Sequence, residues 1–107
     1  MSEEQAWERP FTTALDAVRR GDFDEIKNAL ESLDFKFEQR NDPNHWFYYH
    51  PLLRADPIFR YPRNLYRSHG SRRSSDHISN HDKSQAKQMI QALKAVVGAA
   101  RPSGDDL

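Results

Sequence analysis

Residues 34–50 read DFKFEQRNDPNHWFYYH and contain two strand-like runs separated by a turn. In residues 35–40 uncharged side chains alternate with charged ones, the period of two expected for a strand with one solvent-facing side. The turn residues 41–44 (NDPN) combine a proline that fixes φ with Asn and Asp side chains that bond to nearby backbone. The aromatic run 46–49 favours a second strand. The stretch therefore predicts a β-hairpin with His45 at the start of its second strand.

Two helices are predicted before the hairpin. Pro10, an apolar stripe and Gly21 as a stop indicate a helix over residues 11–20. A second helix is predicted over residues 23–33, because apolar residues recur at helical spacing after Asp22, which forms a capping-box-like pair with Glu25.

The pattern is weaker after the hairpin. Residues 57–59 are consistent with a short edge strand and residues 76–79 with another brief strand, whereas residues 54–75 as a whole are expected to be a basic loop or insertion. Apolar residues from Ala86 to Val97 predict a helix that starts near Lys83 and ends near Gly98.

These elements predict a single α+β domain over residues 1–107, with flexible termini at 1–9 and 99–107. The order is helix, helix, strand, strand, a possible third strand and helix. Such elements form a small antiparallel sheet of two or three strands covered on one face by helices.

Composition narrows the function classes. The chain of 107 residues has no cysteine, which excludes disulfides and thiolate metal sites. No apolar run reaches the length of about 18 residues that a membrane span needs, and no signal peptide is visible, so a cytoplasmic location is expected. The net charge is zero, but residues 1–40 carry ten acidic and six basic side chains, whereas residues 41–100 carry four and nine. This asymmetry favours phosphate binding, unless the chain has only segregated its charges.

His45 is the first candidate for chemistry, because an imidazole accepts and donates protons near neutral pH. RNA carries its own nucleophile, the 2′-hydroxyl, so a nuclease without a metal needs a base, cations around the phosphate and an acid. The alternative is that His45 only ends the turn or packs on Trp46.

Basic residues between 54 and 75 alternate with tyrosines, a pattern that suits single-stranded RNA, since guanidinium groups match phosphates and rings stack on bases. The alternatives are a solvated loop and a surface for an acidic protein. The predicted nucleic-acid contacts are Arg40, Arg63, Arg67, Arg72, Arg73, Lys83 and Tyr66.

His81 is the predicted assistant of His45 in catalysis. His77 and His81 have a spacing of four residues, but the sequence offers no third ligand, so neither a metal site nor a cofactor is predicted.

The helix, the two strands and His45 together resemble the HicA family of toxins, in which a Gly-Ser-His turn follows a helix and a strand, and the next strand ends near His-Pro. Here the corresponding residues are Pro43-Asn44-His45 and His50-Pro51, and residues 78–83 with the last helix are similar to that family's third strand and final helix. The resemblance covers residues 23–97. It implies a double-stranded-RNA-binding-like fold, catalysis by His45, metal-independent cleavage of mRNA and a HicB-type antitoxin as partner. Pro-Asn in place of Gly-Ser, the insertion at 52–75 and the added N-terminal helix are departures from the family pattern.

The sequence thus predicts a toxin-like ribonuclease that cleaves single-stranded mRNA without a metal. One alternative is a module that binds RNA or an acidic protein without cleaving it. Another is a structural adaptor whose acidic N-terminal helices bind a partner. The sequence gives no oligomeric state.

Overall fold

The computed structural model describes residues 5–40, 43–68 and 76–101, and its centre is the predicted hairpin. Strand β1 (Lys36–Gln39) pairs antiparallel with β2 (His45–Tyr49), with Phe37 opposite Tyr48. A third strand, β3 (Arg63–Tyr66), pairs antiparallel with the other side of β2, so the strand order is β1-β2-β3. Its Leu65 lies opposite Trp46.

The two faces of this sheet differ because successive side chains of a strand point to opposite sides. Tyr48 and Leu65 are fully buried and belong to the hydrophobic core, whereas Tyr49 and Tyr66 are exposed. The alternate residues His45, Phe47 and Tyr49 of β2 therefore lie on the face away from the core, which we call the outer face.

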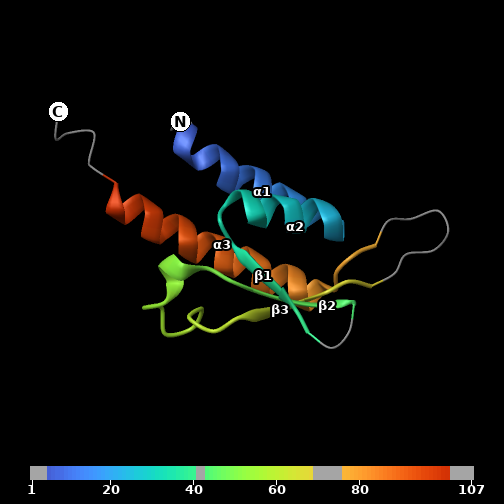
Figure 1. The fold of residues 1–107 in the computed structure, drawn as a ribbon. Coiled ribbons are helices and arrows are strands. Elements are labelled where there is room, and N and C mark those ends of the chain that lie inside the picture. The colour runs from blue at the N-terminus through green and yellow to red at the C-terminus, as the bar shows by residue number, and fades with distance from the viewer. Residues whose placement is uncertain (1–4, 41–42, 69–75, 102–107) are drawn as a thin grey trace.

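Three helices lie on the other side of the sheet (Figure 1). They are α1 (Arg9–Arg20), α2 (Phe23–Ser32) and α3 (Asn80–Ala100). Helix α3 contacts β3, and α1 packs against α2 and α3. Helix α2 contacts β2 through Phe23, whose ring centroid lies 6.5 Å from that of Trp46. Short 3-10 turns precede α1 (Ala6–Glu8) and follow β2 (Pro51–Leu53). The structure confirms the predicted α+β class and the order helix, helix, strands, helix.

The junction of the first two helices follows the predicted signals. Gly21 has φ 82°, a left-handed conformation that glycine adopts without a Cβ penalty, and it ends α1. The Asp22 side chain then accepts a hydrogen bond of 2.9 Å from the Glu25 backbone N–H and caps α2. The two helices are therefore held side by side.

Helix α1 is an integral part of the core and not an appendage. Its Phe11, Ala14, Ala17 and Val18 are buried with residues of α2 and α3. The turn before it packs on the end of α3, where the Arg101 guanidinium lies 5.0 Å from the Trp7 ring centroid. Deletion of residues 1–21, which would test an adaptor role, would therefore expose apolar surface and is not a neutral change.

Two strand predictions were wrong. Residues 57–59 form no strand, because the Asp56 carboxylate accepts hydrogen bonds of 2.8 Å from the backbone N–H groups of Ile58 and Phe59 and folds the chain into a turn. Residues 76–79 form only isolated bridges, in which His77 pairs with Asp22 and Ser68. The third strand instead lies within the predicted basic loop.

Element ends also differ from the predictions. Regular structure begins at Ala6, inside the segment expected to be a flexible terminus, and α3 continues to Ala100. Helix α3 begins before Lys83 because the Ser79 hydroxyl accepts a hydrogen bond of 3.1 Å from the Asp82 backbone N–H. In the described part of the chain, no helix combines the length and apolar character that crossing a membrane requires.

Candidate functional site

The outer face carries an aromatic patch around His45. The His45 and Tyr66 ring centroids are 4.6 Å apart at an interplanar angle of 66°, because the two residues are paired across β2 and β3. Phe47 and Tyr49 continue the row along β2 on the same face. Tyr66 is 36% exposed and Tyr49 is 38% exposed. The outer aromatic patch (His45, Phe47, Tyr49 and Tyr66) is thus accessible to a ligand.

Arg40 borders this patch from the end of β1. Its guanidinium lies 4.7 Å from the Phe47 ring centroid, and its Nη2 donates a hydrogen bond of 3.1 Å to Glu38. That hydrogen bond and the positive charge of Arg40 lower the pKa of the Glu38 carboxyl. Arg40 can therefore exchange a solvent-exposed carboxylate for another anion at little cost, since exposed ion pairs are weak.

Aromatic rings on an exposed sheet face can stack on unpaired bases, and a neighbouring guanidinium can contact the phosphates between them. His45 adds a group that can transfer a proton at the same place. Of the predicted site residues, the structure therefore brings together His45, Tyr66 and Arg40. Sequence reasoning missed Phe47 and Tyr49, although their spacing of two and four residues from His45 was a signal for a shared face.

The Arg67 side chain contacts three separate parts of the fold. Its Nε lies 3.6 Å from Asp76 Oδ2, its Nη2 donates a hydrogen bond of 3.3 Å to the Pro43 carbonyl, and its guanidinium lies 5.5 Å from the Phe23 ring centroid. These contacts join the hairpin turn to the start of α2 and to the segment before α3. Arg67 thus contributes to holding the fold, and the phosphate contact predicted for it stays a prediction.

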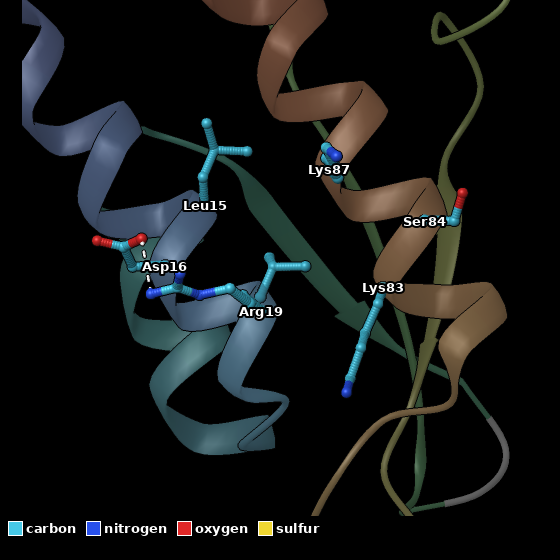
Figure 2. A pocket seen from close by; sticks show the side chains of 7 residues that line it. Leu15, Asp16, Arg19, Lys83, Ser84 and Lys87 are labelled. Carbon is cyan, nitrogen blue, oxygen red and sulfur yellow. Dashed lines mark ion pairs between the residues drawn. The ribbon is translucent and has the colours of Figure 1, made fainter.

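Arg63 and Lys83 are not part of the outer aromatic patch. Arg63 is paired with the inward-facing Tyr48 and donates a hydrogen bond from Nη2 to the Ile58 carbonyl. Lys83 borders a groove of about 460 Å³ between α1 and α3, together with Leu15, Arg19 and Lys87 (Figure 2). Among the predicted cations that the structure describes, Arg40 therefore borders the outer aromatic patch, whereas Arg63 and Lys83 do not belong to it. Arg72 and Arg73 lie outside the described residues.

His81, the predicted assistant, is exposed in the first turn of α3. It lines a groove at the free edge of β3 that also contains Phe47, Asn64 and Asp82. His45 contacts Tyr66 in the outer aromatic patch, which shares Phe47 with this groove. Within the described residues, no group of three or more His, Cys, Asp and Glu side chains is placed to hold a metal.

Tyr48, on the core side of β2, is an unusual polar residue. Its side chain is 0% exposed, and its hydroxyl has no hydrogen-bond partner within the described chain. Burial raises the pKa of Tyr48, the Asp82 carboxylate raises it further, and Arg63 opposes the shift. The hydroxyl must therefore stay protonated in the folded state.

Replacement of Tyr48 by phenylalanine is expected to stabilise the protein by about 1 kcal/mol, because it removes a buried hydroxyl without a partner. In the unfolded chain tyrosine ionises near pH 10, whereas the raised pKa keeps the folded residue neutral. The wild type should thus lose a further 1 kcal/mol or so between about pH 8 and pH 11, relative to Tyr48→Phe. Urea denaturation of both proteins at the two pH values measures this, and equal pH dependence would contradict it.

No protein-family model, no curated protein and no solved structure matches the chain.

Proposed function

We propose that this chain is a metal-independent ribonuclease that binds single-stranded RNA on the outer face of its sheet, with His45 as the proton-transfer group. The observation that carries the proposal is the placement of His45 within the outer aromatic patch, 4.6 Å from Tyr66 between ring centroids. The patch offers rings for stacking, and Arg40 beside Phe47 offers a charge for the phosphate.

In the proposed reaction, bases stack on the rings of the patch and bring a ribose 2′-hydroxyl to the His45 imidazole. The imidazole accepts the hydroxyl proton, and the 2′-oxygen attacks the adjacent phosphorus. The bond to the 5′-oxygen of the next nucleotide breaks, a proton returns to that oxygen, and a 2′,3′-cyclic phosphate remains. Arg40 is placed to stabilise the charge that gathers on the phosphate oxygens.

The resemblance to HicA-type toxins leads to the further proposal that a HicB-type antitoxin neutralises the activity. The order of α2, three antiparallel strands and α3 is compatible with the double-stranded-RNA-binding-like fold that the resemblance implies, but the third strand is Arg63–Tyr66 and not residues 78–83, where the resemblance put it. A co-transcribed neighbouring reading frame that encodes a small DNA-binding protein would support it independently. A neighbourhood without such a frame would count against this partner, while leaving the nuclease activity open to direct assay.

A non-catalytic RNA-binding module is the second candidate. It is favoured by the positions of three predicted cations, because a nuclease needs positive charge beside its proton-transfer group. Arg63 and Arg67 contact other parts of the protein, and Lys83 borders the groove between α1 and α3. The stacking rings serve binding in either case. The two functions differ only in whether the bound strand is cut.

Tyr66→Ala and Phe47→Ala are each expected to weaken binding of single-stranded RNA by about tenfold, because a stacked base contributes about 1–3 kcal/mol. Tyr61→Ala is the matched control, since Tyr61 is exposed outside the sheet and contacts Arg60. The measurement is incubation of labelled RNA with each protein in EDTA, followed by native and denaturing gels. A retarded band reports binding and shorter fragments report cleavage. Equal binding by all three variants would remove the patch from the RNA site.

A further inference from the structure

A second concave site lies at the free edge of β3, next to the outer aromatic patch. This groove has a volume of about 300 Å³ and is lined by residues of the sheet and of the first turns of α3, among them Phe47, Arg63, Asn64, His81, Asp82 and Gln85. We call it the β3-edge groove. Phe47 belongs both to the groove and to the outer aromatic patch, so a strand bound on the patch can extend into it.

Two residues of this groove each carry a polar atom that is left without a partner. Arg63 Nε and Asn64 Oδ1 are buried, and neither has a hydrogen-bond partner in the described part of the chain. Buried polar groups are nearly always hydrogen-bonded in native proteins, so each of these two atoms calls for a partner.

Asp82 fixes the shape of the groove. Its Oδ2 accepts a hydrogen bond of 3.0 Å from the Tyr66 backbone N–H, the group that β3 presents at its unpaired edge. The carboxylate is 6% exposed. It thus joins α3 to β3 at Tyr66, the residue that contacts His45, and the groove has a fixed position relative to the outer aromatic patch.

The charged residues of the β3-edge groove indicate which kind of ligand it can bind. The groove contains one guanidinium, from Arg63, and one carboxylate, from Asp82. A phosphate would be repelled by Asp82, and a cation would be repelled by Arg63. A neutral, flat group with both donors and acceptors suits both of them, together with the amides of Asn64 and Gln85 and the ring of Phe47. A nucleobase has these properties.

We propose that the β3-edge groove binds one nucleobase of the RNA strand, and that this base is a purine. Amide side chains bond in pairs to adenine, and guanidinium groups bond in pairs to guanine, whereas pyrimidines offer fewer matching positions. The inference rests on the proposed function, because it assumes that the strand lies on the outer aromatic patch. It adds a base preference that stacking alone does not provide.

The test uses 2′-O-methyl oligouridines, which cannot be cleaved because the nucleophile is blocked, with one central position changed to A, G or C. Fluorescence anisotropy should show that the wild type binds one purine oligonucleotide about tenfold more tightly than oligouridine. Asn64→Ala and Gln85→Ala should each remove this preference, so that the purine oligonucleotide and oligouridine bind each variant with equal affinity. Gln91→Ala, an exposed glutamine on the same helix outside the groove, should retain it.

The outcomes separate the two proposals. Binding of all oligonucleotides with equal affinity, or a preference that survives both Asn64→Ala and Gln85→Ala, would overturn the base-binding groove while RNA binding stands. Failure to bind any of them would overturn the RNA function and the groove with it. Thermal melting of each variant shows that the loss of preference is not a loss of fold.

Discussion

His45→Ala is expected to abolish RNA cleavage, with a fall in rate of about 10²–10⁴-fold, the contribution typical of a general acid or base. The same variant should retain much of its RNA binding, because Phe47, Tyr49 and Tyr66 remain on the outer face. It should also fold normally, since His45 is only partly buried and lies outside the core. The measurement is the initial rate of fragment formation from labelled single-stranded RNA in EDTA.

His77→Ala is the matched control. His77 forms an isolated bridge with Ser68, just after β3, and its side chain is exposed. Its cleavage rate should equal that of the wild type. A second variant, His45→Gln, keeps a polar side chain that cannot transfer a proton, and it should be as inactive as His45→Ala. Cleavage at the wild-type rate in either His45 variant would remove His45 from the mechanism and leave the binding module.

The hairpin and the last helix were predictable because their signals are local. Alternation before a turn rich in Asn, Asp and Pro indicated β1, the aromatic run after the turn indicated β2, and helical spacing of apolar residues indicated α3. Strand β3 was not predictable in this way, because its four residues include only one buried apolar side chain, Leu65. Its strand conformation depends on pairing with β2, a contact that a local pattern does not contain.

The site was harder to predict than the fold. In β2 both sets of alternate residues are aromatic, Trp46 and Tyr48 on one side and Phe47 and Tyr49 on the other, so hydrophobicity does not tell which set faces the core. Pairing of Tyr48 with Phe37 and packing against Phe35, at 5.8 Å between ring centroids in both cases, decide it.

The arginines show the same limit. A basic segment in the sequence suggested one cationic surface, but alternation along β3 directs Arg63 to the side of Leu65. Arg67 forms an ion pair with Asp76, a residue nine positions away in the sequence. Closeness in sequence therefore did not produce a shared surface.

His50→Ala is expected to lower the free energy of unfolding by about 2–4 kcal/mol, because a buried ring and two hydrogen bonds are lost together. His50 Nε2 donates a hydrogen bond of 2.7 Å to the Leu33 carbonyl at the end of α2, and Nδ1 accepts one of 3.1 Å from the Leu52 backbone N–H. The ring also packs edge-on against Phe35 at 5.0 Å between centroids. Because a carbonyl only accepts and a backbone N–H only donates, Nε2 acts as the donor of the ring and Nδ1 as the acceptor.

Urea denaturation followed by circular dichroism measures the loss, and His45→Ala is the matched control at the other end of β2. The urea midpoint of His45→Ala should stay near that of the wild type. His50→Gln should recover part of the stability, since the amide offers one donor and one acceptor to the groups of Leu33 and Leu52. A midpoint for His50→Ala that equals the wild-type value would show that neither hydrogen bond contributes to the fold. That result would contradict the division of roles that we infer from the surroundings of the two histidines, in which His45 acts on a ligand and His50 holds the end of the strand.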